Sequence, residues 1–400
     1  MKVAGTKSWA SAASAALAAM LVGFSVAGCG FGSSTNAVGC GLVGNAIPGP
    51  APVAGSEFVF VPNALCAPGI ANDVMSVLVI SPDGTFHNGP VPLVQTGNEP
   101  VWAAVDPLNR FVYVTNLADN TVSAFTLNAT TGAVGVVSGS PFPAGTAPAA
   151  AAVDPSGTFL YVANDGSSTI TGSISGYKIN ANGSLTAVPG SPFTTTPGLS
   201  PQQGIAVTTG FVYVSNIATN SVSAFSFDNT GKLTQLAGSP FSLAPALNPQ
   251  PESLAMDPAS RFLFTANMTG NNVSAFTVNG DGSLTPALAS PFGAGFSSPQ
   301  YLVTDPTGSF LYVVNVGNNT VTSYTITPGT GALTQLGVAL STGNFPEGAA
   351  VDAANKFLMV ANCSDADLSI FSINNGALTA LGPLISSAII SCPQMVATTR

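Results

Sequence analysis

The chain has 400 residues, of which 6% are charged, and its 17 acidic and 8 basic side chains give a formal net charge of −9. A chain this acidic repels phosphate groups, so we expect no nucleic-acid partner. One histidine and five cysteines also make a metal site built from His and Cys ligands a poor expectation.

The N-terminus has the features of an export signal. Lys2 and Lys7 precede an apolar, Ala-rich run over residues 9–26, which ends in Val26-Ala27-Gly28-Cys29. This order of charge, apolar run and small residues is typical of a secretory signal peptide. Small residues directly before a cysteine resemble the processing box of bacterial lipoproteins, which implies removal of residues 1–28 and lipidation of Cys29. We therefore expect a cell-envelope protein that is anchored by lipid alone, in the outer membrane or facing the periplasm if the cell is Gram-negative.

The next segment predicts a flexible tether. Residues 29–54 are rich in Gly, Pro, Ser and Asn and have no apolar period, which is typical of linkers. No later stretch has the length needed to cross a bilayer. The folded domain is predicted over residues 55–400.

That domain is a repeat protein. A hexamer of the form Phe, apolar, Phe/Tyr/Met, Val/Thr, any residue, Asn occurs seven times, and its copies begin 47 to 53 residues apart, at Phe58, Phe111, Phe159, Phe211, Phe262, Phe310 and Phe357. A period near 50 that contains only short apolar runs and turn residues indicates a radial array of four-stranded blades. We predict an all-β, seven-bladed β-propeller of four-stranded antiparallel blades. We also expect a monomer.

The third repeat defines the four strands, here called a to d from first to last. Strand a is predicted over residues 149–153, strand b over 159–163, strand c over 174–179 and strand d over 185–188. Pro and Gly fill the turns between them, and Val, Ile, Phe, Tyr and Thr fill the strands. Strand c recurs as Val-Ser-Ala-Phe and the end of the repeat as Ser-Pro-Phe.

The two ends of the chain are predicted to share a blade. Pro393-Gln-Met-Val-Ala-Thr-Thr399 matches strand a of the sixth repeat but has no strand b after it, whereas the strand b at Phe58 has no strand a before it. We expect the C-terminal strand to complete the first blade, because either piece alone would leave an open sheet edge.

Four cysteines follow Cys29, and an exported protein can oxidise them. Cys392 lies just before the closing strand and Cys66 just after strand b of the same blade. We predict a Cys66–Cys392 disulfide, with Cys363–Cys392 across neighbouring blades as the alternative. Because no C-x-x-C motif is present, the expected role is a structural staple.

The repeated Asp-Pro-x-Gly-x-Phe-Leu-Tyr-Val-x-Asn, the Val-Ser-Ala-Phe strand and the Gly-x-Leu before strand d resemble the seven-bladed propellers of the 6-phosphogluconolactonase-like (lactonase) family, and more broadly the YVTN-type repeats. The resemblance implies hydrolysis of a sugar lactone. In the family pattern strand a often begins Pro-Arg-His, whereas the matching places here begin Pro251-Glu252, Pro299-Gln300, Pro346-Glu347 and Pro393-Gln394.

The antiparallel order predicts two unlike faces. Turns between a and b and between c and d share the turn face, and the b-to-c and d-to-a connections share the loop face, where propeller ligands usually bind. The basic residues after Cys29 all map to the turn face, whereas the loop face receives Asp73, Glu99, Asp119, Asp165, Glu252, Glu347, Asp365 and Asp367. We expect this face to repel anions.

The candidate ligand-binding residues begin strands a near the axis: Gln202, Glu252, Gln300, Glu347 and Gln394, together with Trp102, which offers a ring for stacking on a sugar. The alternatives are that the polar residues cap strand ends around a water-filled channel and that Trp102 packs between blades. Asp365 and Asp367 are a weak candidate for Ca²⁺, and we otherwise predict no cofactor.

Two functions remain open. The first, which we favour, is an envelope-tethered binding or scaffold propeller whose acidic loop face takes a small neutral or cationic ligand or another envelope protein. The second is a sugar lactone hydrolase that uses carboxylates in place of Arg and His. No catalytic residue can be assigned from the sequence.

Overall fold

The structure, a computed structural model, describes residues 48–64, 73–167, 170–194, 204–243, 249–293, 295–383 and 392–400. Throughout these residues the regular structure is β-strand, and none of it is a helix that is long and apolar enough to cross a membrane.

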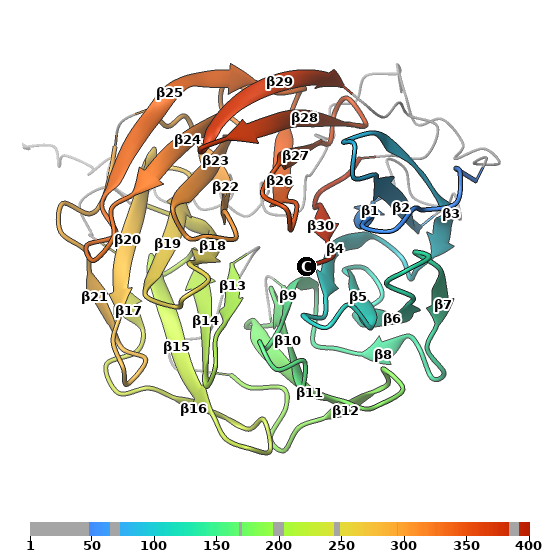
Figure 1. Cartoon of the computed structure of the whole chain (residues 1–400). Helices are drawn as coiled ribbons and strands as arrows, with labels where there is room; N and C mark the ends of the chain where they lie inside the picture. The colour runs from blue at the N-terminus through green and yellow to red at the C-terminus, as the bar shows by residue number, and fades with distance from the viewer. Residues whose placement is uncertain are drawn as a thin grey trace, which may run out of the picture.

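Seven antiparallel sheets stand around a central axis as the blades of a propeller (Figure 1). In each blade strand a is innermost and strand d is outermost, so the seven strands a surround the axis. The predicted fold class, a seven-bladed propeller with four-stranded blades, is confirmed. The strands are short because each one crosses only the height of the ring.

The first four blades, each given from strand a to strand d, have the following strands. Blade 1 contains β30 (Ala397–Thr398), β1 (Glu57–Asn63), β2 (Val74–Ile80) and β3 (Phe86–Gln95). Blade 2 contains β4 (Pro100–Val105), β5 (Phe111–Asn116), β6 (Thr121–Leu127) and β7 (Val134–Val136), with β8 (Phe142–Pro143) beside β6. Blade 3 contains β9 (Pro148–Val153), β10 (Phe159–Asn164), β11 (Ser173–Ile179) and β12 (Leu185–Ala187). Blade 4 contains β13 (Ile205–Val207), β14 (Phe211–Asn216), β15 (Ser221–Phe227) and β16 (Leu233–Gln235), with β17 (Phe241–Ser242) beside β15.

The remaining blades follow the same order. Blade 5 contains β18 (Pro251–Met256), β19 (Phe262–Asn267), β20 (Asn272–Val278) and β21 (Leu284–Pro286). Blade 6 contains β22 (Pro299–Thr304), β23 (Phe310–Asn315), β24 (Thr320–Ile326) and β25 (Leu333–Ser341). Blade 7 contains β26 (Pro346–Val351), β27 (Phe357–Asn362), β28 (Asp367–Asn374) and β29 (Ala377–Pro383).

The closing strand lies where the sequence predicts it. β30 pairs with β1 through Thr398 opposite Val59 and Ala397 opposite Phe60. The backbone N–H of Phe58 donates to Oγ1 of Thr399 at 3.0 Å. In five other blades an aspartate holds this turn, as Asp154 does by accepting from the backbone N–H of Phe159. A threonine therefore replaces the turn aspartate where the chain ends meet.

The phenylalanine that begins each strand b explains why a glycine recurs in the c-to-d turn of the next blade. Phe159 lies so close to Gly231 of the next blade that a Cβ on this glycine would be 2.6 Å from the ring. The same contact occurs at all seven junctions, including the one from Phe357 of blade 7 to Gly84 of blade 1. Gly231 also has a φ of 81°, so both space and backbone conformation require glycine.

Two further repeated motifs stabilise the blades, and the second of them occurs in blades 2 to 5. Asn216 at the end of strand b donates from Nδ2 to Oγ of Ser221 and Ser223 on strand c, so the serine of Val-Ser-Ala-Phe binds the buried amide. The Oγ of Ser239, in the Ser-Pro-Phe segment, accepts from the backbone N–H of Ala224. Both motifs therefore stabilise strand c, one from each side.

The predicted disulfide pairing is wrong. Cys392 is bonded to Cys363, which was the alternative, and the bridge joins the b-to-c loop of blade 7 to the closing strand of blade 1. Cys363 lies directly after β27 and its backbone N–H donates to the carbonyl of Phe345. Cys66, Cys40 and Cys29 lie outside the described residues.

Candidate functional site

Strand a carries a β-bulge at its loop-face end. In β18 the pairing with β19 shifts between Pro251 and Ser253, so Glu252 has no direct partner, and the same shift leaves Gln300 in β22 and Glu347 in β26 unpaired. A bulge breaks the alternation of side chains and re-aims the extra one. The candidate residues of the sequence therefore occupy equivalent bulges on the innermost strands of blades 5, 6 and 7.

One long-range interaction places Glu252 at the axis. The charge of Asp165, which follows β10 in blade 3, raises the pKa of Glu252 in blade 5. Blades 3 and 5 are not neighbours, so the charge of Asp165 acts on Glu252 from another part of the ring. Burial is the larger cause, and together the two effects raise the pKa of Glu252 to about 7. Burial alone raises the pKa of Asp165 to about 7.

Glu347 is the most deeply buried acid of this group. The residue is 2% exposed and its Oε2 has no hydrogen-bond partner. Burial raises the pKa of Glu347 to about 8, and no neighbouring charge contributes to the shift. Glu347 is therefore a separate group, and neither Glu252 nor Asp165 contributes to its pKa shift. Near neutral pH the Glu347 carboxyl is largely protonated and can donate a hydrogen bond.

Gln300 and Gln394 complete the described part of this ring. Both are half-buried, Gln394 on the closing strand. Gln202, the fifth predicted member, lies outside the described residues. We call the group formed by Asp165, Glu252, Gln300, Glu347 and Gln394 the mouth.

An aromatic pair closes the axis one residue below the bulges. The ring centroids of Trp102 in blade 2 and Tyr301 in blade 6 are 6.0 Å apart in a tilted arrangement, although the two blades are not adjacent. Nε1 of Trp102 donates to the carbonyl of Ala151 at 2.8 Å. Trp102 is 8% exposed and Tyr301 is 7% exposed. Trp102 therefore packs across the axis and forms the floor of the mouth with Tyr301.

Ser253 adds a second buried polar atom without a partner. It follows Glu252 directly, is fully buried, and its Oγ has no hydrogen-bond partner. A buried hydroxyl or carboxyl usually finds a partner, and leaving one without costs about 1–3 kcal/mol. Ser253 in blade 5 and Glu347 in blade 7 thus each place a buried polar atom without a hydrogen-bond partner on an innermost strand.

Other acids of the loop face have structural partners. Asp73 accepts from the backbone N–H of Glu99, and Asp119 accepts from the backbone and side chain of Asn98. In blade 7, Asp365 binds Asn344 in the same way as Asp119 binds Asn98. These aspartates hold the connection that enters the blade.

The weak Ca²⁺ candidate consists of Asp365 and Asp367, which line a small cleft together with Thr342 and Ser369. Asp365 is occupied by its two bonds to Asn344, and Asp367 accepts from Nδ2 of Asn362 at 2.7 Å. Within the described residues no group of three or more His, Cys, Asp or Glu side chains is arranged to hold a metal ion. These two aspartates act in hydrogen bonding within the blade.

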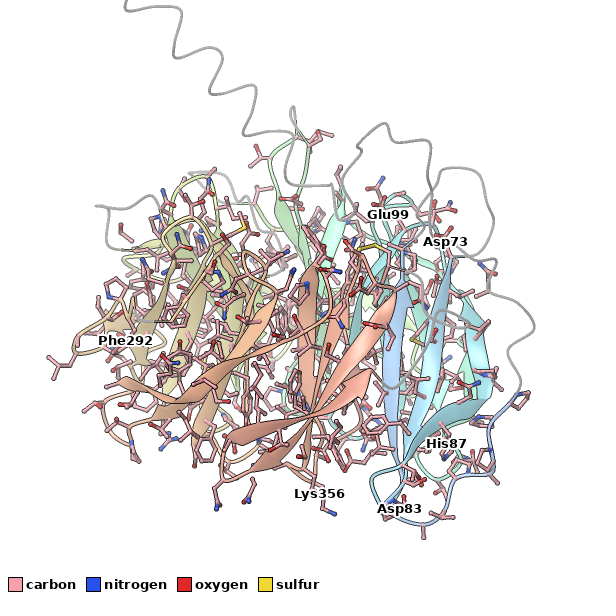
Figure 2. The ribbon with its side chains drawn as sticks, turned by 90° about the horizontal axis from the view of Figure 1, so that it is seen from above. Asp73, Asp83, His87, Glu99, Phe292 and Lys356 are labelled. Carbon is pink, nitrogen blue, oxygen red and sulfur yellow. A yellow bond between two sulfur atoms is a disulfide. The ribbon has the colours of Figure 1, made fainter. Side chains whose placement is uncertain are left out.

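The basic residues lie at the opposite end of the ring. Lys356 sits in the turn between β26 and β27, and Figure 2 shows it at the same end as Asp83 and His87, whereas Asp73 and Glu99 lie at the other end. The other basic residues after Cys29 also occupy turns or strand ends of the turn face: Arg110, Lys178, Lys232, Arg261 and Arg400. His87 is bonded there to Oγ of Ser81. The predicted separation of charge between the faces thus matches the strand bounds.

Sequence reasoning missed two members of this site. Asp165 counted as one of several loop-face acids, and no sequence signal placed it opposite Glu252. Tyr301 was not singled out, although Tyr301 and Trp102 are both aromatic residues two places after the proline that begins strand a. Both act across the ring, Tyr301 by ring contact with Trp102 and Asp165 by its charge on Glu252.

The fold and the mouth define a seven-bladed propeller with a carboxyl-lined axial site. The chain matches the profile of the family described as lactonase, 7-bladed beta-propeller, over residues 75–291 and 288–388, and it belongs to that family. No functionally curated protein gives a significant match.

Solved structures agree with the fold. A putative 6-phosphogluconolactonase from Bacteroides fragilis is 19% identical, with 88% of this chain and 100% of that chain covered and a TM-score of 0.71. The periplasmic gluconolactonase of Pseudomonas aeruginosa is 18% identical, with 86% and 99% covered and a TM-score of 0.69. A protein from Lactobacillus plantarum is 19% identical, with 86% and 100% covered and a TM-score of 0.69.

Proposed function

We propose that the protein is an envelope-attached binding propeller whose mouth takes a small ligand without negative charge. The observation that carries the proposal is the buried Glu347 carboxyl, whose Oε2 lacks a partner. A protonated carboxyl donates to an uncharged oxygen such as a sugar hydroxyl or a carbonyl. An ionised carboxyl, favoured above pH 8, accepts from a cation instead. Another envelope protein could bind in the same way, by placing an uncharged or cationic group in the mouth. We expect no nucleic-acid partner.

The absence of basic residues from the described loop face supports the same ligand class. Burial disfavours the charged form of both Glu252 and Asp165, and the pKa of each is raised to about 7. A phosphate or carboxylate entering here meets acids and no compensating cation. A neutral polyol or an amine meets donors and acceptors that have no other described partner.

A thermal-shift experiment tests this proposal. The purified protein is screened against neutral sugars, sugar lactones, amines and divalent cations, since a ligand that binds the native state raises Tm. We expect a hit whose shift is lost in the double variant Glu252→Gln and Glu347→Gln and is kept in Glu99→Gln, a half-buried acid of the same face. A ligand that stabilises both variants equally would place binding elsewhere.

A second candidate function is hydrolysis of an uncharged sugar lactone. Family membership favours it, and so does a mouth in which carboxyl pKa values of about 7 and 8 lie near ambient pH, where general acid–base catalysis is most effective. In this scheme the Asp165–Glu252 pair takes a proton from water, and the water oxygen bonds to the lactone carbonyl carbon. The ring C–O bond then breaks, and Glu347 protonates the leaving oxygen.

The hydrolysis candidate has its own readout. With unphosphorylated gluconolactone as substrate, Glu347→Gln should lower kcat by about 10²–10⁴-fold, the usual contribution of a positioned acid or base. Glu99→Gln should leave kcat unchanged. If neither variant nor wild type exceeds the spontaneous rate, binding is the remaining function.

We further propose that the chain reaches the envelope through Cys29. Acyl chains, rather than the propeller, would supply the anchoring, and stable anchoring needs more than one chain. Cys29→Ser should therefore release the protein from the membrane fraction. Membrane association that survives this substitution would refute lipidation at Cys29.

A further inference from the structure

Five junctions between blades share one hydrogen bond at the loop face. The residue directly before strand c accepts, through its side-chain oxygen, from the backbone N–H of the residue directly before strand a of the next blade. The pairs and their distances are Asp73–Glu99, 3.1 Å; Asn120–Ala147, 2.7 Å; Asn220–Gln250, 2.8 Å; Asn271–Ser298, 2.6 Å; and Asn319–Phe345, 3.0 Å.

Both partners of this link keep an unusual backbone conformation. The donors have positive φ, for example 49° at Gln250 and 56° at Phe345, and the four asparagine acceptors have positive φ as well. Asparagine adopts this left-handed conformation more readily than other residues with a side chain. The link thus uses a residue suited to the conformation and holds each strand a against the blade before it.

The junction from blade 7 to blade 1 differs in composition while keeping the conformation. The residue before β28 is Ala366, whose φ of 54° matches that of the asparagines but whose methyl group cannot accept a hydrogen bond. The residue before the closing strand is Cys392, with a φ of 42°. Here the disulfide Cys363–Cys392 connects the same two segments.

The disulfide also borders the mouth on both sides. Cys392 is followed by Pro393 and Gln394, and Cys363 donates from its backbone N–H to Phe345 at 3.0 Å, two residues before Glu347. The strands approach closely between these points, because a Cβ on Gly348 would lie 2.5 Å from the carbonyl oxygen of Gln394. A change in the position of the closing strand therefore changes the surroundings of Glu347.

We propose that the Cys363–Cys392 disulfide takes the place of the asparagine link at the one junction where the chain ends meet, and that it positions the closing strand beside Glu347. The first half of this inference concerns the ring alone. The second half rests on the proposed function of the mouth. In the double variant Cys363→Ser and Cys392→Ser the closing strand should open locally more often, while the other junctions stay closed.

Hydrogen exchange read by mass spectrometry measures such local opening. In the double cysteine variant we expect at least about tenfold faster exchange, a factor equivalent to about 1.4 kcal/mol, in residues 393–399 and 58–60. Exchange in β9, β18 and β22 should be unchanged. Equal exchange in the closing strand of wild type and variant would overturn the proposal.

Reduction of the folded wild type gives a second measurement if the variant folds poorly. A dithiol such as dithiothreitol transfers two electrons to the disulfide, is itself oxidised to a cyclic disulfide, and leaves Cys363 and Cys392 as thiols. Faster exchange confined to the same segments supports the proposal. Unchanged exchange after the two thiols have been verified by alkylation contradicts it.

A rescue variant separates this mechanism from a general effect of losing a crosslink. Adding Ala366→Asn to the double cysteine variant restores the side chain used at the other junctions, so protection of residues 393–399 should return in part. Ser364→Asn, an exposed position in the same loop, should restore nothing. If Ala366→Asn and Ser364→Asn have the same effect, the disulfide does not take the place of the asparagine hydrogen bond.

Two experiments, one without and one with a ligand probe, test whether the disulfide positions the closing strand beside Glu347. The dependence of Tm on pH that Glu347 confers should weaken in the double cysteine variant, because a mobile closing strand admits water to the carboxyl. Binding of unphosphorylated gluconolactone should weaken in parallel. If the exchange data hold while wild type binds no probe, the proposed function fails and the junction mechanism stands. If the pH dependence is the same with and without the disulfide, the positioning role is wrong.

Discussion

Glu347 carries a carboxyl group in surroundings that disfavour its charge. The residue is 2% exposed and burial raises its pKa to about 8. In the unfolded chain the same carboxyl has its ordinary pKa of about 4.3. The folded protein therefore binds a proton between these values that the unfolded chain has lost, and raising the pH across this window lowers the free energy of unfolding.

The first prediction follows from that linkage. Glu347→Gln removes the titrating group while keeping a similar shape, so its Tm should exceed that of wild type at pH 8.5 and approach it at pH 5. Thermal unfolding in a pH series measures the difference. Asp83→Asn is the control, because this exposed carboxyl has a lowered pKa and titrates well below the window. Parallel Tm curves for wild type and Glu347→Gln would mean that Glu347 is ionised in the fold.

At the scale of the blade, contact between neighbours depends on the seven turn glycines. Gly231 in the c-to-d turn of blade 4 lies under Phe159 of blade 3, and it has a φ of 81°. Gly210, in the a-to-b turn of the same blade, has a φ of 97° but would place a Cβ in open space. Comparing substitutions at Gly210 and Gly231 separates the cost of backbone strain from the cost of a steric conflict with the neighbouring blade.

The second prediction uses this pair. Gly210→Ala should cost about 1–2 kcal/mol, the penalty for a left-handed residue that bears a Cβ. Gly231→Ala adds a steric conflict with Phe159, and such overpacking costs about 1–3 kcal/mol more. Urea unfolding measures both. Equal destabilisation would show that the Phe159 ring moves aside freely.

The strands of each blade could be predicted from the sequence because the apolar and turn residues that define them lie close together in the chain. In the third repeat the predicted strand b over residues 159–163 corresponds to β10, and the predicted strand d over 185–188 corresponds to β12 (Leu185–Ala187). The closing strand was predictable for the same reason, since Pro393 and Gln394 repeat the start of β22. Local pattern decides these elements.

The mouth was predictable only in outline because its contacts join distant repeats. Glu252 and Glu347 were identified from their place in strand a, whereas the sequence did not indicate that the charge of Asp165, in another blade, raises the pKa of Glu252. The disulfide was misassigned to Cys66 because Cys363 reaches Cys392 across a junction whose geometry a single repeat does not reveal. Equivalent positions can be read from a pattern, but distances across the ring cannot.

At the scale of the whole molecule, ring closure makes the two chain ends depend on each other. β30 is the innermost strand of blade 1, and Met395 and Val396 are buried beside it. Its loss exposes the edge of β1 and removes apolar surface between blades 7 and 2. An open strand edge also promotes association between molecules.

The third prediction concerns that closure. Deleting residues 393–400 should prevent folding or cause aggregation, whereas deleting Arg400 alone should be tolerated, because it removes mainly the contacts with Asn109. Size-exclusion chromatography and thermal unfolding compare the two truncations. A longer truncation that stays monomeric with an unchanged Tm would refute the shared blade.

We expect the separation of charge between the two faces to favour uncharged over anionic ligands at the mouth. Acids dominate the loop face and the basic residues after Cys29 lie on the turn face, so a phosphorylated sugar encounters a negative potential as it approaches. The unphosphorylated sugar encounters no such barrier. We therefore predict no significant hydrolysis of 6-phosphogluconolactone, even if unphosphorylated gluconolactone is bound or hydrolysed. The comparison is made at low salt, where charge repulsion is least screened, with both lactones at equal concentration. Turnover of the phosphorylated lactone at a rate on the order of 1 per second or more, typical of enzymes, would show that the potential at the mouth does not decide the substrate.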